Sequence, residues 1–208
     1  MVAKNIVPYG DLPRTDATSL YAADGTRKYL NRDERRRALE NMQALDTDKA
    51  LFALTLAWTG ARVSEVLALT PSSFQIERGI VAFVTLKRRR HSVREVPIPA
   101  QLIDAIERQY RMRRAQADPI ASHERLWRWH RVTAWRIIKH VVAQIGLTGK
   151  SACPRGLRHG FGVGAIQAGV PLNLVQRWLG HARISTTAIY TDASGPEERG
   201  LAQMFWQQ

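Results

Sequence analysis

The sequence predicts an α+β fold that is mainly α-helical and carries one small β-hairpin or sheet. Apolar residues recur at helical spacing in several segments that begin at capping residues or prolines and end at glycines. Two short runs rich in β-branched residues, 79–86 and 93–98, lie close together in the chain. With 208 residues, the chain is long enough for one well-buried core and tails.

The charge of the chain points to a polyanionic partner. Lys and Arg number 31 against 18 Asp and Glu, which gives a formal net charge of +13. Nucleic acid is the first expectation. A membrane surface is the alternative, but no basic amphipathic helix with a clean apolar face stands out, and no apolar run is long enough to span a bilayer. The 45% hydrophobic content excludes disorder of the whole chain.

Cysteine and histidine usage argues against disulfides and metal sites. Cys153 is the only cysteine, so no intrachain disulfide is possible and a reducing compartment is expected. An inert, partly buried thiol is favoured over a reactive one. The six histidines show no metal-ligand spacing, and no hydrophobic segment of a signal peptide follows the first residues. We therefore expect a cytoplasmic protein without a metal.

The N-terminal part of the chain predicts an arm followed by two helices. Residues 1–27 contain Pro and Gly without periodicity, which indicates an arm or linker. Asn31 and Glu34 have the spacing of a capping box at the start of the first helix. The second helix, capped by Thr47 or Asp48, is apolar nearly all round and is expected in the core.

Arg62 lies at the start of the next helical segment. Gly60 ends the preceding helix, and Val63 begins an inward-facing apolar stripe. Local sequence alone favours a surface arginine that pairs with Glu65, with a role in a polar site as the alternative.

The predicted hairpin has a strongly basic tip. Residues 87–92 read Lys-Arg-Arg-Arg-His-Ser between the two extended runs. Such a charge run is usually a solvated turn, but a basic tip can also reach a DNA backbone. The sequence favours neither interpretation.

Two longer helices are expected after the hairpin. The first opens at Pro99 and continues past Tyr110, with its arginines on the outer face. The second ends at Gly146, and its inward positions are Val132, Trp135, Ile138, Val141, Val142 and Ile145. Tryptophans interleaved with arginines can stack on unpaired bases. Packing in the core is nevertheless the favoured interpretation.

The last third of the chain holds the densest set of phosphate-binding and nucleophilic groups. It contains Arg155, Arg158, His159, His181 and Tyr190 among apolar helical stretches. Cleavage of a phosphodiester by a side chain requires a nucleophile, donors for the non-bridging oxygens and an acid for the leaving oxygen. Tyrosine, arginine, histidine and lysine can fill these roles without a cofactor, because fixed guanidinium groups supply positive charge.

Three separated motifs resemble those of the tyrosine site-specific recombinases, the phage integrase family. They are Thr59–Glu65, Leu157–His159, and Leu179–His181 followed by Ser185–Tyr190. The resemblance covers roughly residues 29–193 and implies the catalytic-domain fold of that family. It also reverses the local preference for Arg62 as a plain surface residue.

The resemblance implies roles for individual residues. It makes Arg62 and Arg158 the two catalytic arginines, His181 the catalytic histidine and Tyr190 the nucleophile. Lys87 matches the catalytic lysine of the hairpin, although the longer hairpin leaves Arg88 or Arg89 as alternatives. Contacts to the DNA are expected from Arg88, Arg89, Arg90, Arg131, Arg136 and Lys139.

The chain departs from the family pattern at one catalytic position and in length. Arg155 stands where the family usually has a histidine; it can bind phosphate but cannot accept a proton. For His159, the sequence leaves a supporting or structural role open. With residues 28–193 as catalytic domain and 194–208 as a tail helix, the chain is similar to short members such as the fimbrial-switch invertases.

The implied activity is DNA strand transfer through a 3′-phosphotyrosyl intermediate. The expected partners are double-stranded DNA, a tetramer formed on two sites and DNA-bending accessory proteins, in the cytoplasm with the nucleoid. An inactive DNA-binding regulator and a type IB topoisomerase-like enzyme are the alternatives. The target sequence, and the choice among integration, excision, inversion and resolution, stay open.

Overall fold

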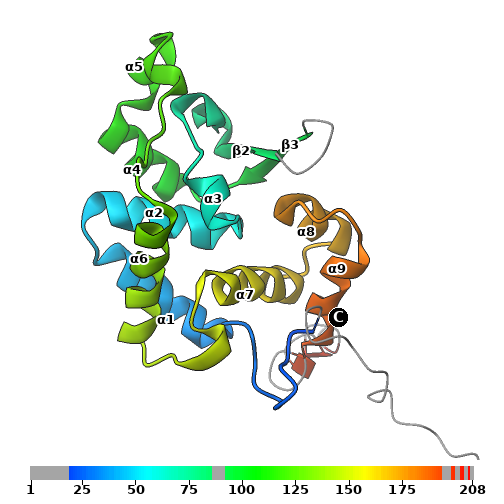
Figure 1. Cartoon of the computed structure of the whole chain (residues 1–208). Helices are drawn as coiled ribbons and strands as arrows, with labels where there is room; N and C mark the ends of the chain where they lie inside the picture. The colour runs from blue at the N-terminus through cyan, green and yellow to red at the C-terminus, as the bar shows by residue number, and fades with distance from the viewer. Residues whose placement is uncertain (1–18, 86–91, 194–197, 200–201, 204–205, 207–208) are drawn as a thin grey trace, which may run out of the picture.

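The computed structural model describes residues 19–85, 92–193, 198–199, 202–203 and 206. Helices dominate the described chain and accompany a small antiparallel sheet, which confirms the predicted fold class (Figure 1). The helices are α1 (Arg32–Gln43), α2 (Thr47–Thr59), α3 (Val63–Val66), α4 (Ala100–Tyr110), α5 (Met112–Ala117), α6 (Arg131–Gln144), α7 (Pro154–Gln167), α8 (Leu172–Leu179) and α9 (Ser185–Ala188). The strands are β1 (Phe74–Gln75), β2 (Ile80–Thr85) and β3 (Ser92–Pro97). Short 3₁₀ turns are η1 (Pro71–Ser73), η2 (Ile76–Arg78), η3 (Ala121–His123), η4 (Gly149–Ser151) and η5 (Ile189–Asp192).

The start of α1 agrees with the sequence, whereas the cap of α2 does not. The Asn31 side chain accepts a hydrogen bond from the Glu34 backbone N–H, and the Glu34 carboxylate accepts one from that of Asn31. The prediction of Thr47 or Asp48 as the cap of α2 is wrong by one residue, because Asp46 holds the N-cap position. Its carboxylate pairs with the Lys49 ammonium at 2.6 Å instead of capping the helix.

The sheet contains the predicted hairpin and one further strand. Strands β2 and β3 pair antiparallel, with Val81 opposite Val96 and Phe83 opposite Arg94. Strand β1 adds Phe74 and Gln75 to the outer edge of β2. Two residues are too few to show an alternating pattern, so the sequence could not reveal this strand. The tip at residues 86–91 lies outside the described residues.

The helix expected to run past Tyr110 is interrupted. Arg111 adopts a left-handed backbone conformation (φ 48°, ψ 53°), which ends α4 and redirects the chain into α5. The turn buries Met112 completely and brings the Arg113 guanidinium to the Glu77 carboxylate at 2.7 Å. A non-glycine residue at positive φ does not change the spacing of apolar residues along the sequence. The spacing therefore predicts one continuous helix and does not indicate the break at Arg111.

The inward face of α6 agrees with the prediction except near the start of the helix. Ile138, Val141, Val142 and Ile145 are buried as predicted. Val132 and Trp135, also expected inside, are half exposed, and Ala134 and Ile137 are buried in their place. The core interpretation is therefore wrong for Trp135. It is confirmed for Trp127, which is 2% exposed and packs edge-on against Phe52.

Helix α7 lies across the centre of the molecule and borders two hydrophobic clusters (Figure 1). Leu157, near its start, belongs to the larger cluster of α1, α2, α4, α6 and the sheet. Phe161 and Val163, one turn further on, belong to a smaller cluster with α8 and η5, which includes Tyr190. The buried residues of α7 therefore connect the main core to the segment that carries Tyr190, the predicted nucleophile.

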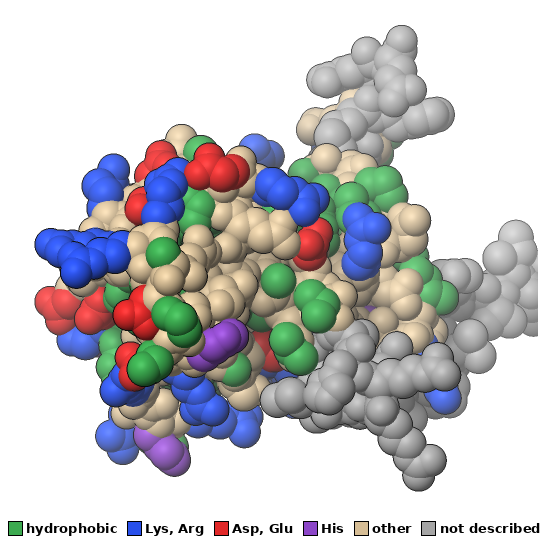
Figure 2. Space-filling model, turned by 90° about the horizontal axis from the view of Figure 1, so that it is seen from above, with side chains coloured by type: hydrophobic (Ala, Val, Ile, Leu, Met, Phe, Trp, Pro, Cys, Tyr) green, Lys and Arg blue, Asp and Glu red, His purple; other side chains and the backbone are tan. Residues whose placement is uncertain are grey.

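The exposed surface carries many basic groups. Seen from above, Lys and Arg side chains are spread over the visible face with acidic side chains among them (Figure 2). Within the described ranges, no helix is long and apolar enough to cross a membrane.

Gly60 offers a test of how α2, α7 and α8 fit together. It adopts φ +60°, and a Cβ placed there would lie 2.5 Å from Phe161 Cδ1 and 2.9 Å from Leu179 Cδ2. We expect Gly60→Ala to lower the free energy of unfolding by about 2–4 kcal/mol, from left-handed strain plus steric overlap. Gly146→Ala, at φ +76° with no atom within 4 Å of the added Cβ, is the matched control and should lose only the strain component. Denaturant unfolding of both variants measures the difference; equal losses would contradict the packing argument.

Candidate active site

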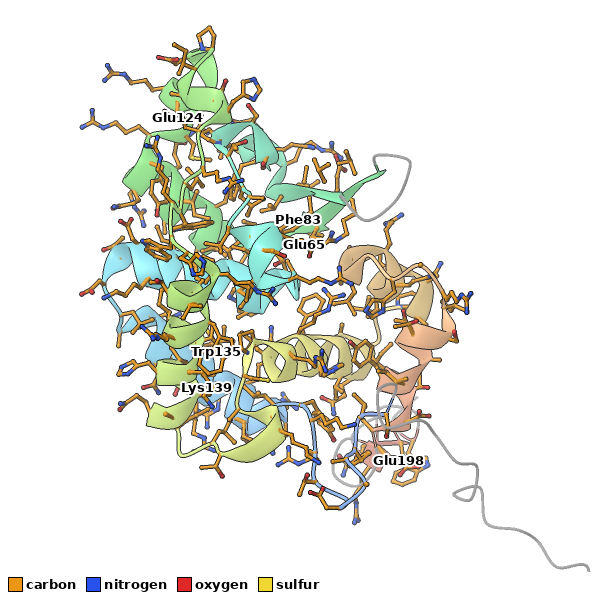
Figure 3. All side chains as sticks on the ribbon, viewed as in Figure 1. Glu65, Phe83, Glu124, Trp135, Lys139 and Glu198 are labelled. Carbon is orange, nitrogen blue, oxygen red and sulfur yellow. The ribbon has the colours of Figure 1, made fainter. Side chains whose placement is uncertain are left out.

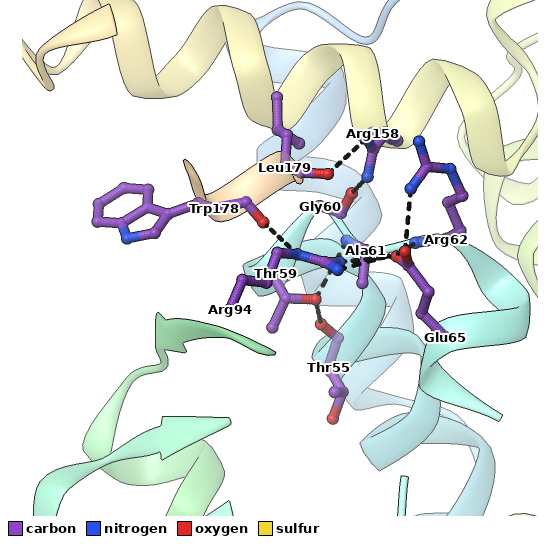
Figure 4. A network of polar contacts seen from close by, with 10 residues as sticks. All are labelled: Thr55, Thr59, Gly60, Ala61, Arg62, Glu65, Arg94, Arg158, Trp178 and Leu179. Atoms are coloured by element: carbon purple, nitrogen blue, oxygen red, sulfur yellow. Dashed lines mark hydrogen bonds and ion pairs between the residues drawn. The ribbon is translucent and has the colours of Figure 1, made fainter. Parts of the chain in front are cut away.

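Arg158 is fixed by two main-chain carbonyl groups from different parts of the chain. Its Nη1 donates to the Gly60 oxygen at 2.6 Å, and its Nη2 donates to the Leu179 oxygen at 2.8 Å (Figure 4). The side chain thereby joins α7 to the ends of α2 and α8. Burial and the nearby Arg62 guanidinium lower the pKa of Arg158 to about 10, so the group stays charged at neutral pH.

Arg62 lies beside Arg158 and is oriented by Glu65. It is the N-cap of α3; its backbone N–H donates to Glu65 Oε2 at 2.8 Å, and its Nη1 donates to Glu65 Oε1 at 2.9 Å. The pairing that the local sequence favours is therefore present. It does not make Arg62 a plain surface residue, because the guanidinium still lies next to that of Arg158 (Figure 4).

Arg94 is a buried arginine that connects three elements, and the sequence analysis did not predict it as part of the site. It is 5% exposed, its Nη2 donates to Glu65 Oε2 at 2.7 Å, and its Nε donates to the Trp178 carbonyl oxygen at 2.8 Å. The guanidinium lies 4.6 Å from the centre of the Phe83 ring, and Phe83 and Glu65 lie where the sheet meets α3 (Figure 3). Arg94 thus ties β3 to α3 and to the end of α8.

The sequence did contain a signal for Arg94. In the extended run 93–98, alternate residues face the core, and Val96 and Ile98 occupy the same face as Arg94. An arginine at an inward strand position requires a buried partner, which directs attention to Glu65. Burial tends to raise the pKa of the Glu65 carboxyl, but Arg94 and Arg62 outweigh it and hold that pKa below its usual value.

Tyr190 lies between the two histidines of the site. Its hydroxyl is 3.2 Å from His159 Nδ1, and its ring stacks on that of His181 with 6.1 Å between ring centres. His181 Nδ1 is 2.9 Å from the Thr187 hydroxyl in the helix that leads into η5. Tyr190 is 2% exposed, and burial raises the pKa of its phenol although Arg158 and Arg62 act in the opposite direction.

Both histidines are uncharged at neutral pH. Burial and the charges of Arg158 and Arg155 lower the pKa of His159 to about 4. Burial and the charges of Arg158 and Arg62 lower the pKa of His181 to about 3. Each imidazole can therefore accept one hydrogen bond and donate another.

Gly162 makes room for the Tyr190 ring. A Cβ at this position would lie 2.6 Å from both Cε2 and Cζ of Tyr190. Because real Cβ atoms do not approach ring carbons so closely, only glycine lets the phenol pack against α7 at this point.

The structure brings some of the predicted site residues together and leaves others apart. Arg62, Arg158, His181 and Tyr190 form one site, and the network in Figure 4 contains its two arginines. Arg155 is exposed on the first turn of α7, close enough for its charge to act on His159. Lys87, Arg88, Arg89 and Arg90 lie outside the described residues.

The three residues of α6 that are expected to contact DNA differ in their exposure to solvent. Arg131 and Arg136 are exposed. Lys139 is partly buried, donates to the Ala152 carbonyl oxygen at 2.8 Å and lies 5.7 Å from the Trp135 ring centre (Figure 3). Its contacts are those of a residue that fastens α6 to the start of α7. In the part of the chain that the structure describes, no group of His, Cys, Asp or Glu side chains has the arrangement of a metal site.

The arrangement combines two fixed guanidinium groups with the buried hydroxyl of Tyr190. Two guanidinium groups can share the non-bridging oxygens of a phosphodiester, and they cost little reorganisation because carbonyl and carboxylate groups already orient them. Tyr190 can attack from the adjacent side once its phenol reaches the phosphorus.

Removal of the Arg94 charge tests whether this residue supports the site. We expect Arg94→Met to lower the free energy of unfolding by about 3 kcal/mol, because Glu65 loses its most buried partner and the Trp178 carbonyl loses its donor. Arg78→Met, which removes an exposed arginine near the same sheet, should change stability by less than about 0.5 kcal/mol. The double variant Arg94→Met with Glu65→Gln should recover part of the loss. Denaturant titrations of these variants and of Glu65→Gln alone give the four values needed; additive losses in the double variant would contradict the coupling.

Comparison with known proteins identifies the family of the chain. The family model described as the phage integrase family matches residues 28–196. Tyrosine recombinase XerD of Yersinia pestis is 32% identical over 162 residues, which are 75% of this chain and 53% of that protein. The chain thus spans about half the length of this relative.

Solved structures show the same fold. The crystal structure of XerA recombinase superposes with a TM-score of 0.68 and 28% identity over 86% of this chain and 64% of that one. XerH site-specific recombinase bound to its difH substrate has the same TM-score at 21% identity, over 89% of this chain and 59% of that one. The sequence match, the fold and the paired arginines, histidine and tyrosine place this chain in the phage integrase family.

Proposed function

We propose that this chain cleaves and rejoins double-stranded DNA at specific sites, with Tyr190 as the nucleophile. The observation that carries the proposal is the position of Tyr190 beside His181 and the paired guanidinium groups of Arg62 and Arg158. The net charge of +13 suits a polyanionic substrate. Relatives named as tyrosine recombinases, and a structural neighbour solved with its DNA substrate, support the same activity.

In the proposed reaction, the two arginines bind the scissile phosphate and Tyr190 attacks the phosphorus. The bond from phosphorus to the tyrosine oxygen forms, and the bond to the 5′ oxygen of the next nucleotide breaks. Lys87 supplies the proton that this leaving oxygen takes up, because an ammonium crowded by arginines is a better acid. The phosphotyrosyl diester keeps the bond energy, so attack by another 5′ hydroxyl reverses the step.

Tyr190 has to become accessible before it can react. Its phenol is buried in the smaller hydrophobic cluster, where it packs on α7. We propose that binding of DNA opens access to this cluster, so that the phosphate held by Arg62 and Arg158 reaches the phenol while its hydroxyl keeps the contact with His159. A tetramer on two sites, with DNA-bending accessory proteins, is the proposed assembly, and 194–208 is the segment proposed to connect neighbouring copies.

Two other functions share parts of this site. An inactive regulator of the same fold would bind DNA without forming a covalent link. A type IB topoisomerase-like enzyme would form the link but act on one duplex alone. The presence of Tyr190, His181 and both arginines in one site favours an active enzyme, and the named recombinases among the relatives favour exchange over relaxation.

Covalent capture of DNA tests the proposed function. The protein is incubated with a library of nicked duplexes of random sequence, covalent complexes are isolated under denaturing conditions, and the attached DNA is sequenced. We expect a denaturation-resistant complex with the wild-type chain, recovery of one sequence motif and no complex with Tyr190→Phe. Exchange between two copies of the recovered site separates recombination from relaxation. Absence of any covalent complex would support the inactive regulator.

The packing of Tyr190 on α7 gives a second test. We expect Gly162→Ala to slow formation of the covalent complex at least tenfold, because the added methyl displaces the phenol from its position. Gly164→Ala is the matched control: it lies on the same helix, with no atom within 4 Å of its added Cβ. Both changes raise helix propensity by about 1 kcal/mol, so propensity cannot explain a difference between them. Similar cleavage rates would show that this contact does not set the position of the nucleophile.

A further inference from the structure

Building on the proposed recombinase function, we propose that His159 is the general base of the reaction and accepts the phenolic proton of Tyr190 at Nδ1. Arg155, on the first turn of α7, has no acceptor atom and cannot take this proton. His159 lies one residue beyond Arg158 on α7, and its side chain meets the reacting atom itself.

The geometry supports direct proton transfer. His159 Nδ1 and the Tyr190 hydroxyl oxygen are 3.2 Å apart, within hydrogen-bond reach, and the two ring centres are 5.8 Å apart. In the neutral tautomer with hydrogen on Nε2, Nδ1 carries a free lone pair and the phenol donates to it. Among the hydrogen bonds of the described residues, this is the one that the Tyr190 hydroxyl makes.

The other basic groups of the site do not suit this role. Arg155 stays protonated and has no acceptor atom. Nδ1 of His181 is engaged with the Thr187 hydroxyl at 2.9 Å, and the His181 ring stacks on the Tyr190 ring with 6.1 Å between the ring centres. That arrangement leaves His181 available for the phosphate and His159 for the phenol.

The charges around His159 make it a base that strengthens when substrate binds. The titratable groups that act on it or face it are Arg155 and Arg158 on α7, Lys28 before α1, His181 after α8, and Tyr190 in η5. Without DNA, burial and the neighbouring positive charges hold the pKa of His159 near 4, so the imidazole is neutral and ready to accept a proton. A phosphodiester bound by Arg158 adds a negative charge beside these groups. That charge raises the pKa of His159 and stabilises the imidazolium as it forms.

The proposed step balances in atoms and charge. The O–H bond of Tyr190 breaks as the N–H bond at His159 Nδ1 forms, while phosphorus exchanges its 5′ oxygen for the tyrosine oxygen. The 5′ oxygen takes its proton from the acid, proposed as Lys87. In the rejoining step, the imidazolium of His159 returns its proton to the departing tyrosine oxygen.

His159→Asn is the variant that isolates proton transfer. The asparagine side chain can still accept a hydrogen bond from Tyr190 but cannot take its proton. We expect single-turnover formation of the covalent complex, on the nicked duplex recovered above, to slow about 100-fold at pH 7.5. His123→Asn, an exposed histidine in η3, is the control and should react at the wild-type rate.

Two readouts separate a base from a structural residue. Attack without a base requires the phenolate, so the rate of His159→Asn should rise about tenfold per pH unit between pH 7 and 9, more steeply than that of the wild-type chain. Replacement of Tyr190 by a ring-fluorinated tyrosine lowers the pKa of the phenol and should restore much of the lost rate in His159→Asn. A 5′-bridging phosphorothiolate, whose leaving group needs no acid, should not restore it.

The outcomes distinguish this inference from the function on which it rests. A covalent complex formed by His159→Asn at the wild-type rate or faster overturns the inference and leaves the recombinase function intact. A slow variant that fluorotyrosine and high pH do not rescue, or that the phosphorothiolate does rescue, also overturns it. Failure of the wild-type chain to form any complex removes the recombinase function and this inference together.

Discussion

The site depends on one arginine that is held by the backbone. Arg158 uses its two terminal nitrogens on the Gly60 and Leu179 carbonyl oxygens, at the ends of two helices far apart in sequence. Each of these helices ends in a glycine with left-handed conformation, Gly60 at φ +60° and Gly180 at φ +67°. The terminal carbonyls of a helix lack partners in the helix itself. Arg158 donates to one such carbonyl at the end of each helix, so the fold is stabilised by the same group that is proposed to bind the phosphate.

Arg94 and Glu65 extend this arrangement to the sheet. Arg94 donates to the Trp178 carbonyl, one residue before the carbonyl that Arg158 uses, and to the carboxylate that orients Arg62. The end of α8 is therefore held by two arginines from opposite sides (Figure 4). The neighbouring guanidinium groups of Arg62 and Arg158 repel one another, and the Glu65 carboxylate offsets part of that repulsion.

Much of the fold and part of the site could be predicted because they depend on local rules. The capping box at Asn31, the helix stop at Gly60 and the hairpin follow from spacing and residue type. The break at Arg111 and the exposure of Val132 and Trp135 at the start of α6 could not be predicted, because packing against the rest of the chain decides both. The same holds for the contact between His159 and Tyr190, which are 31 residues apart and meet only through the packing of η5 on α7.

The division into two hydrophobic clusters bears on how the buried Tyr190 could act as the proposed nucleophile. Ala61 and Val63, on either side of Arg62, belong to the larger cluster, whereas Tyr190 packs in the smaller one with Phe161 and Val163. Opening of a small cluster exposes less apolar surface than opening of the main core, so it has a lower free-energy cost. In the proposed reaction, the segment after α8 opens to expose the phenol while the arginines stay fixed on α3 and α7. The energetic cost of activation then lies in the smaller cluster, where the proposed contacts with DNA offset it.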